Sequence, residues 1–340
     1  MTRTIKVFIF ATALCFLSSG CEGKREHLIQ GRTMGTTYHI KVVTGYFQGV
    51  SGLKERIEKR LVEINAAMST YQTDSEISRF NEFNQIGRKF KISQDFYRVM
   101  KIVQDVYRLS DGAWDGTVNP LVDLWGFGRG RVKNRIPLEN EIFALLSNIG
   151  FENIEIPEPG YLLKKRAAVT LDLSSIAKGY GVDQVADAIR KEGFQDYLVE
   201  IGGEVVASGH SKEGMLWRIG INRPQADATF DEVYKVVNLR NRAFATSGDY
   251  RNFFVVDGIR YAHIIDPRTA YPISNGVVSV TIIADTCTFA DGLATAIMVM
   301  GPEKGLALIN RLQAVEGLIV VEQMDGSLVD FYSKGFEALK

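Results

Sequence analysis

Short apolar runs separated by turn residues fill the second half of the sequence, and this feature limits the possible folds more than any other. Each run has the length of a strand, and turn-forming residues stand between the runs. Strands joined by turns rather than by helical crossovers pair in antiparallel fashion. A largely antiparallel sheet is therefore predicted from residues 197–201, 205–209, 216–222, 235–239, 243–248, 253–257, 261–265 and 277–284.

Apolar residues at helical spacing occur mainly in the first half of the chain. They predict helices near residues 53–68, 96–106, 142–149 and 182–189. A later pair of helices surrounds Gly301 and Pro302, and a final hairpin follows. Shorter strands are predicted at residues 38–42, 161–165 and 169–173. Because helices gather early and strands late, without a repeat or a linker, we predict one α+β unit with two lobes.

The overall charge bears on the class of partner. The chain has 40 basic and 40 acidic residues, so its formal net charge is zero. Binding to a phosphate backbone normally needs a local basic excess, so no nucleic-acid partner is expected. Charged residues make up 24% and hydrophobic residues 46%, which is typical of a globular protein.

The N-terminus has the composition of a targeting segment. Residues 1–20 contain two basic residues, a short apolar run and small residues at the end, as in a secretory signal peptide. Cys21 follows directly, as in a lipoprotein signal, although Leu17 lies one place further from it than usual. We therefore expect cleavage before a lipidated Cys21 and a polar tether over residues 21–30, with a simple secreted form as the alternative.

The remaining cysteine content excludes two kinds of site. Cys15 would leave with the signal peptide and Cys21 would carry lipid, so Cys287 would stand alone. The folded body is then expected to have neither an internal disulfide nor a cysteine zinc site. A buried, inert thiol is expected at Cys287.

Residues 171–181, LDLSSIAKGYG, combine polar chemistry with the start of a helix. We expect Ser174 and Ser175 to supply oxygens at the helix start, where free N–H groups could hold an anion. Lys178 is a residue that a structural turn would not require. The alternative is an ordinary strand followed by a serine-capped helix.

Asp291 and Thr295 stand four residues apart in a segment that is otherwise apolar, so they share one helix face. A buried carboxylate is costly unless it is paired or coordinated. Carboxylate and hydroxyl oxygens suit a hard cation such as Mg²⁺. Alternatively, Asp291 caps the helix and Thr295 bonds its own backbone.

Other candidate positions lie on turns and loops. His263 stands on a strand that ends in a turn at Asp266, although a lone histidine is usually structural. Tyr71 is either a core-capping aromatic or a surface for ring stacking. The glycine-rich segments 202–209 and 247–250 suit close backbone approach. Neither a phosphate-loop motif nor a GxSxG motif is present.

The order of the motifs TMGTTY, STY, GAWDGTVNPLVDLWGFG, LDLSSIAKGYGVD, GGE, TSGDY, HIIDPRTAYP and ADGLAT resembles the ApbE family of bacterial FAD:protein FMN transferases. The similarity extends from about Gly31 to Ser333, and we predict one such domain over residues 31–335. It implies a T-fold-like α+β architecture with FAD bound between two lobes. It also implies a membrane-anchored lipoprotein on the periplasmic side, with the inner membrane as the expected anchor.

The resemblance also implies a site and a reaction. FMN would move from FAD onto a Thr or Ser hydroxyl of an extracytoplasmic redox protein, releasing AMP, with Mg²⁺ as cofactor. Mg²⁺ would be held by the Asp291 and Thr295 side chains and the Ser175 carbonyl, and His263 would act as general base. Eight residues would line the FAD site, with Tyr71 stacked on the flavin: Met34, Tyr71, Ala113, Trp114, Asp115, Asp172, Lys178 and Ile265.

Two alternatives and two departures accompany this expectation. Water could replace the acceptor hydroxyl, which would make the protein an FAD pyrophosphatase, or the protein could be a flavin-binding lipoprotein without chemistry. Ala270 stands where the family usually has glycine, which predicts a less free backbone. Glu204 stands where Asp or Asn is commoner, which leaves a ligand contact by its side chain open.

Overall fold

The computed structural model describes residues 23–128, 135–229 and 232–339. The predicted signal peptide and Cys21 lie outside these residues. Four of the eight predicted strand segments, 216–222, 235–239, 253–257 and 261–265, pair in separate two-stranded sheets. The other four belong to a single large sheet of eight strands that organises the fold, and each of its strands is antiparallel to its neighbours, as predicted. Its strands, in spatial order, are β1 (Lys24–Thr33), β2 (Thr36–Gly45), β6 (Asp196–Ile201), β7 (Glu204–Ser208), β10 (Arg242–Gly248), β15 (Val277–Ala284), β16 (Glu316–Glu322) and β17 (Leu328–Tyr332).

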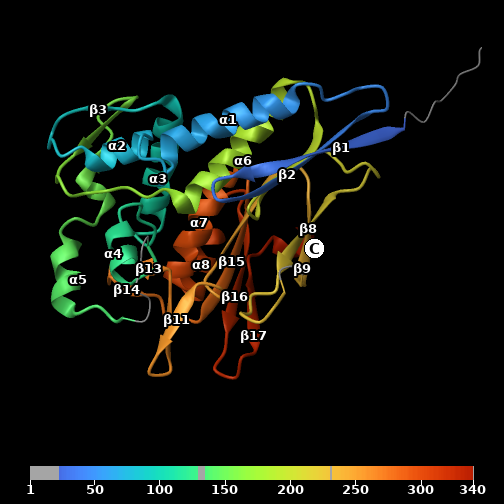
Figure 1. The fold of residues 1–340 in the computed structure, drawn as a ribbon. Helices are drawn as coiled ribbons and strands as arrows, with labels where there is room; N and C mark the ends of the chain where they lie inside the picture. Colours follow the sequence, from blue (N-terminus) through green and yellow to red (C-terminus); the bar gives the residue numbers. More distant parts are fainter. Residues whose placement is uncertain (1–22, 129–134, 230–231, 340) are drawn as a thin grey trace, which may run out of the picture.

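Both faces of this sheet are covered, which explains why every residue of β15 is buried. On one face lie α6 (Ser174–Lys191) and α7 (Cys287–Met300), and Val280 and Ile282 belong to the same core as Leu293 of α7. On the other face, β8 (Trp217–Asn222) and β9 (Val233–Leu239) form a hairpin whose Trp217 packs in one cluster with Ile283. In Figure 1 the helices and the β8–β9 hairpin lie on opposite sides of β15.

The helices of the first half form a second lobe beside the sheet (Figure 1). Its main helices α1 and α3 bury the faces predicted from their periodicity. The remaining helices, of which α1 and α8 also pack on the sheet, are α1 (Leu53–Met68), α2 (Glu76–Glu82), α3 (Gln94–Leu109), α4 (Asn119–Leu124), α5 (Glu139–Leu146), α8 (Pro302–Ile309) and the 3₁₀ turns Phe151–Asn153 and Phe336–Leu339. The short strands are β3 (Phe90–Lys91), β4 (Ile154–Glu155), β5 (Tyr161–Lys164), β11 (Phe253–Val256), β12 (Ile259–Ala262), β13 (Ile265–Asp266) and β14 (Tyr271–Pro272).

Three predicted local features were wrong. The predicted tether is an edge strand from Lys24 onward, because β1 pairs with β2 along its whole length. The segment 169–173 is extended but is not a strand. The segments 69–81 and 112–128, which we expected to be loops, form the short helices α2 and α4, because Ser75 caps α2 and Pro120 lies in the first turn of α4.

Within the described ranges, every helix is too short or too polar to cross a membrane.

Candidate active site

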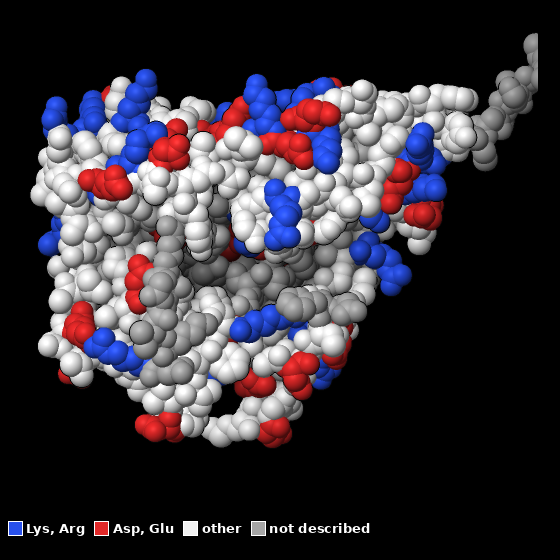
Figure 2. Space-filling view, viewed as in Figure 1, with Lys and Arg blue, Asp and Glu red and all other residues white. Residues whose placement is uncertain are grey.

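A cavity of about 870 Å³ lies between the two lobes, within the usual range for ligand pockets of about 300–1,000 Å³. One wall, here called the loop wall, comes from residues 70–82, 113–128 and 170–172. The other, the helix–sheet wall, comes from α6, α7 and the ends of β7 and β10, together with residues 263–267. Figure 2 shows acidic and basic side chains interspersed over this face of the molecule, in line with its zero net charge.

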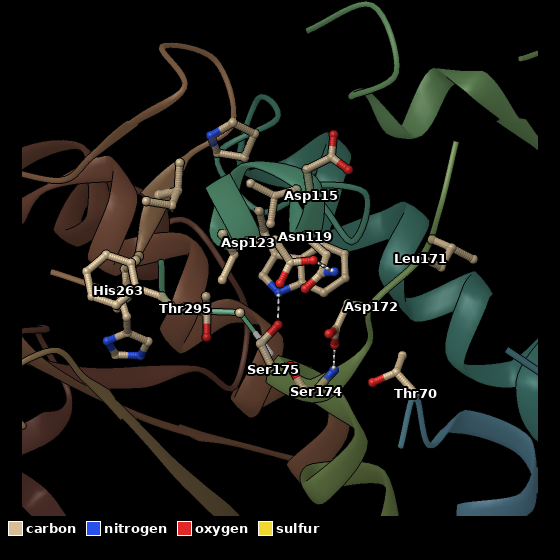
Figure 3. Close-up of a pocket in the computed structure, with 18 of the residues that line it drawn as sticks. Thr70, Asp115, Asn119, Asp123, Leu171, Asp172, Ser174, Ser175, His263 and Thr295 are labelled. Carbon is tan, nitrogen blue, oxygen red and sulfur yellow. Dashed lines mark hydrogen bonds between the residues drawn. The ribbon is translucent and has the colours of Figure 1, made fainter. Parts of the chain in front are cut away.

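Eleven of the twelve predicted site residues line this cavity, and they come from segments spread over most of the chain. Figure 3 shows His263 and Thr295 on one side of it and Asp172 on the other. The eleven are Tyr71, Ala113, Trp114, Asp115, Asp172, Ser175, Lys178, His263, Ile265, Asp291 and Thr295.

Met34 is the exception: it is not among the residues that line the cavity, and its contact with FAD stays a prediction. It occupies the turn between β1 and β2 with a φ of 49°, in the left-handed region. Its side chain is half-buried against the two helical cores, close to Gly181. Met34 therefore packs behind α6 rather than in the lining.

The start of α6 is held by Asp172 rather than by the predicted serines. Asp172 Oδ1 accepts the Ser174 N–H at 2.7 Å, and the Asp172 N–H donates to the Gly116 carbonyl at 2.7 Å. Ser175 instead accepts the indole N–H of Trp114 through its hydroxyl at 3.0 Å (Figure 3). The loop wall and the helix start are thus joined at two points.

The side chain of Asn81 pairs with the backbone of the segment 169–173 at Leu171, as a neighbouring strand would. Its side-chain amide donates to the Leu171 carbonyl at 2.8 Å and accepts the Leu171 N–H at 2.7 Å. The buried ammonium of Lys164 donates to the Asn81 carbonyl at 3.0 Å, and burial lowers the pKa of this lysine to about 8. The two Asn81 side-chain contacts satisfy both backbone groups of Leu171.

The helix–sheet wall contains a buried charge cluster of Lys178, Glu204 and Asp291. Lys178 Nζ lies 2.5 Å from Glu204 Oε1, and Glu204 is only 2% exposed. Asp291, 3% exposed, accepts the Gly179 N–H through Oδ2 at 2.9 Å. Burial raises the pKa of both carboxyl groups, that of Glu204 to about 8, while Lys178 opposes the shift. Burial favours a lower pKa for Lys178, but the two carboxylates outweigh it and raise that pKa.

Close packing of α6 on α7 brings these charges together. A Cβ atom on Gly179 would lie 2.4 Å from the Cys287 carbonyl oxygen, so only glycine permits this approach. Cys287 itself is a buried free thiol, as predicted. The predicted apolar helix, α7, thus places Asp291 against the backbone of α6, which carries Lys178.

The cluster fits a bound cation. Two buried carboxylates surround one ammonium, and Glu204 Oε2 has no hydrogen-bond partner among the described residues. Thr295 Oγ1 lies 2.9 Å from Ser247 Oγ, which adds hydroxyl oxygens beside Asp291. Oxygen donors of these kinds are the ligands that Mg²⁺ prefers. The described ranges contain no cluster of three or more His, Cys, Asp or Glu arranged for a metal, so such a site would depend on mixed oxygen ligands.

The alternative of a purely structural Asp291 and Thr295 does not match these contacts. Asp291 lies in the second turn of α7, whose N-cap is Thr286, and it bonds the backbone of another helix. Thr295 makes its side-chain contact across to Ser247 on β10. Both side chains therefore face the cavity region between α7, α6 and the sheet.

His263 follows β12, and both its backbone and its ring contact the Asn252 carbonyl. Its N–H donates to the Asn252 carbonyl at 3.1 Å, and its ring Nδ1 lies 3.2 Å from the same oxygen. A carbonyl can only accept, so Nδ1 carries the hydrogen and Nε2 is the basic nitrogen. This tautomer is the one that a general base at Nε2 requires.

Asp115 lines the cavity, but its oxygens are occupied by the protein. They accept the Thr117 N–H at 2.7 Å, the Thr117 hydroxyl at 2.6 Å and the Phe151 N–H at 2.9 Å. Burial raises the pKa of Asp115, and these hydrogen bonds oppose the rise. Asp115 therefore fixes the shape of the loop wall.

Tyr71 lies on the loop wall and is 79% exposed. Such exposure rejects the core-capping alternative, and ring stacking is the remaining expectation. Ala270 has a φ of 68°, so this position needs the left-handed conformation that glycine would adopt more easily.

The cavity also includes polar residues that the sequence did not single out as ligands. Glu204 and Ser247 lie in the two glycine-rich segments noted above, so a signal for them existed. Asn81, Asn119 and Asp123 had no such signal, because they lie on short helices that were predicted as loop.

Comparison with known proteins agrees with this geometry. The model of the ApbE family matches residues 34–319. An FAD:protein FMN transferase from Vibrio cholerae is 42% identical over 323 residues, which cover 94% of this chain and 95% of that protein. The protein of that name from Haemophilus influenzae is 38% identical over 337 residues, covering 97% and 96%.

Solved structures show the same similarity. The flavin transferase ApbE from Vibrio cholerae superposes with a TM-score of 0.85 at 40% identity, covering 93% of this chain and all of that one. The apo form of the flavinyl transferase ApbE from Pseudomonas stutzeri gives a TM-score of 0.83 at 37% identity, covering 93% and 97%. The α+β fold predicted from the motifs is confirmed.

Proposed function

Because the chain belongs to the ApbE family, we infer that it is an FAD:protein FMN transferase, which moves FMN from FAD onto an acceptor protein. The observation that carries this inference is the convergence of eleven predicted site residues on one cavity between the lobes. The cavity is large enough for a dinucleotide-sized ligand, and its exposed Tyr71 offers a stacking surface at one wall.

We propose that the acceptor group is a Thr or Ser hydroxyl. Its oxygen attacks the phosphorus atom of the FMN half of FAD, and a P–O bond to the acceptor forms. The P–O bond within the pyrophosphate breaks, and AMP leaves with the bridging oxygen. The hydroxyl proton passes to Nε2 of His263, the nitrogen left basic by the Nδ1 contact with Asn252.

We propose that the helix–sheet wall holds the pyrophosphate. The Lys178 ammonium supplies a positive charge there, and Glu204 fixes its position. Asp291, Thr295 and the Ser175 carbonyl would hold Mg²⁺, and its fit rests on these oxygen donors and on Glu204 Oε2, which has no hydrogen-bond partner among the described residues. When bound, Mg²⁺ would neutralise charge on the pyrophosphate.

The location remains a proposal that the N-terminal sequence supports. Residues 1–20 read as a signal peptide and Cys21 as a lipidation site, which would anchor the enzyme on the periplasmic face of a bacterial membrane. Growth with a labelled fatty acid should label the wild-type protein and leave Cys21→Ser unlabelled. Equal labelling of both proteins would contradict the proposal.

One experiment tests the function itself. Purified protein lacking residues 1–22 is mixed with FAD, Mg²⁺ and a protein that carries a candidate acceptor threonine, and the products are run on a denaturing gel. A fluorescent acceptor band together with AMP supports transfer. AMP and free FMN without a labelled acceptor would indicate hydrolysis, and bound but intact FAD would indicate a storage protein.

A further inference from the structure

We propose that Tyr46 and Phe47, in the turn between β2 and α1, contact the surface of the lipid bilayer that anchors the chain. This inference goes beyond the reaction and rests on the proposed location, in which Cys21 carries lipid. Tyr46 is 62% exposed and Phe47 94% exposed. Single exposed apolar residues are common, so the proposal depends on where this pair lies and on how it is held.

Hydrogen bonds hold the turn of residues 45–48 in one shape. The Gln48 N–H donates to the Gly45 carbonyl at 3.0 Å, which places the two aromatic residues at the centre of a tight turn. The buried Thr44 hydroxyl donates to the Gln48 carbonyl at 2.8 Å and lies 3.0 Å from His27 Nε2 on β1. The rings are therefore presented in advance, and little conformational entropy is lost when a surface covers them.

Neither turn chemistry nor core packing explains two aromatic rings at these positions. Tight turns favour glycine, proline and short polar residues at their centre. The two rings contact each other edge to face, with their centres 5.2 Å apart. Neither belongs to an apolar cluster of the described residues, so the rings contribute little to the stability of the chain.

The position of the turn identifies the bilayer as the surface that would cover it. Lys24, the first residue of β1, pairs with Gly45. A Cβ atom on the preceding Gly23 would lie 3.9 Å from the Tyr46 ring. Cys21 stands two residues before Gly23, and two residues span at most about 7 Å. A lipid on Cys21 would therefore enter the membrane beside the aromatic pair.

The chemistry of the neighbouring side chains also suits a lipid surface. A tyrosine ring with a polar hydroxyl fits the boundary between headgroups and acyl chains, and Phe47 extends the apolar part of the contact. Arg25 lies opposite Thr44 and is exposed. Lys24 pairs with Asp196 at 2.7 Å, whereas Arg25 has no ion pair within the described residues. Its charge is free to attract anionic headgroups.

A second contact with the bilayer would fix the orientation of the enzyme. A lipid chain on Cys21 alone would tether the folded body without fixing its direction. In Figure 1 the start of β1 and the loop after β2 lie at one end of the molecule, away from α4. Because α4 lines the cavity, the contact would direct the lobe that carries α4 away from the membrane.

The test measures the depth of a spin label on the full-length lipidated protein in vesicles of phosphatidylglycerol and phosphatidylethanolamine. Gln48→Cys places the label in the same turn and leaves both rings in place. Met324→Cys is the matched control, because Met324 is also an exposed apolar residue in a turn, between β16 and β17, far from the start of β1 (Figure 1). Cys287 is buried and should take no label. Collision rates with oxygen and with a water-soluble nickel chelate give the depth.

The label at residue 48 should lie about 5–10 Å inside the headgroup boundary, and the label at residue 324 should lie in water. Adding Tyr46→Ser and Phe47→Ser should return the label at residue 48 to water. These changes affect exposed side chains, so the Tm and the transfer rate in detergent should match those of wild type. A label at residue 48 that lies in water, or that keeps its depth without the two rings, would overturn the proposal.

The failure of the proposed location would look different. If the protein without an introduced cysteine took up the label, Cys21 would be free and the location would be wrong. Sedimentation with the same vesicles would then decide the role of the turn. Binding that is about 10- to 100-fold weaker without the two rings would support it, and equal binding would overturn it. A dimer in detergent that dissociates without the rings would assign them to a second copy of the chain and would also overturn the proposal.

Discussion

Asp115 and Asp291 are buried to a similar degree, 6% and 3% exposed, on the two walls of one cavity, yet their carboxylates meet different partners. Asp115 accepts three hydrogen bonds from its own loop and the start of a neighbouring 3₁₀ turn. Asp291 accepts one from Gly179 and shares the charge of Lys178 with Glu204. Burial alone therefore does not identify a ligand residue. What identifies it is a carboxylate whose oxygens can still accept bonds after their contacts within the protein are made.

The largest expected effect is that of Asp291→Asn. The amide oxygen can still accept the Gly179 N–H, but the charge that would hold Mg²⁺ is lost. We expect transfer to fall by about a thousandfold or more, because a metal supplies several kcal/mol of charge stabilisation. The measurement is the transfer rate across a Mg²⁺ titration, and a variant that still responds to Mg²⁺ like wild type would place the cation elsewhere.

Asp115→Asn should act on stability instead. Thr117 bonds one carboxylate oxygen and Phe151 the other, and the amide oxygen can replace only one of them, so the NH₂ group leaves a buried donor without its partner. We expect the free energy of unfolding to fall by about 3 kcal/mol, measured by urea denaturation. The transfer activity of the protein that remains folded should depend on Mg²⁺ as in wild type. If transfer by Asp115→Asn no longer depended on Mg²⁺ while its stability was unchanged, the proposed difference between Asp115 and Asp291 would be wrong.

A third buried carboxylate, Asp249, lies in neither wall and shows what burial does by itself. Burial raises the pKa of Asp249 to about 6, although Arg260 opposes the rise. Between about pH 4 and pH 6 the folded protein therefore keeps a proton that the unfolded chain releases. This contribution to stability is fully present at low pH and is lost as the pH rises through 6.

Asp249→Asn removes that titration. From pH 4.5 to pH 7, wild type should lose about 2 kcal/mol of unfolding free energy relative to the variant. Urea denaturation of both proteins at the two pH values provides the measurement, and other titrating groups cancel in the difference. Parallel changes in the two proteins would mean that Asp249 is ionised across the whole range.

Tyr71 tests the exposed part of the loop wall. Tyr71→Ala should raise the Kd for FAD about tenfold, since stacking of a ring on an aromatic side chain contributes about 1–3 kcal/mol. Tyr71→Phe retains the ring and should bind FAD nearly as wild type does. Fluorescence titration of FAD measures both, and equal affinity in all three proteins would remove Tyr71 from the flavin site.

The smallest effect is expected at Ser175. Its predicted contribution to the metal site is its backbone carbonyl, which Ser175→Ala leaves in place. The hydroxyl does accept the Trp114 indole N–H, so a loss of about 1 kcal/mol in stability is expected, with transfer within about threefold of wild type. A loss of Mg²⁺-dependent transfer as severe as in Asp291→Asn would show that the proposed ligand set is wrong.

Much of the fold could be predicted because its signals are local. The six apolar residues of 277–284 indicated a strand, and because both faces of the sheet are covered, its two polar residues, Ser279 and Thr281, are buried as well. The segment 169–173 shows the limit of such signals. It has the composition of a strand, but its neighbour is the Asn81 side chain from a distant short helix, a tertiary contact that no local pattern encodes.

The residues of the site also divide into those with a signal in the local sequence and those that depend on tertiary contacts. Asp291 and Thr295 were found because a polar pair on an apolar helix is conspicuous, and the motif order supplied most of the rest. The role of Glu204 could not be predicted, since it depends on the ion pair with Lys178 across the α6–β7 packing. Met34 was predicted from its motif alone; its side chain packs against the core beside α6, and its contact with FAD stays a prediction.

The span of the cavity lining has a consequence for how this enzyme matures. Its residues run from Thr70 to Val299, and its floor depends on a sheet in which β7, β10 and β15 become neighbours only after long stretches of chain have emerged. Contacts between distant segments form late and slowly. FAD should therefore bind only after nearly the whole chain has been made and folded, and fragments ending before α7 should bind no flavin.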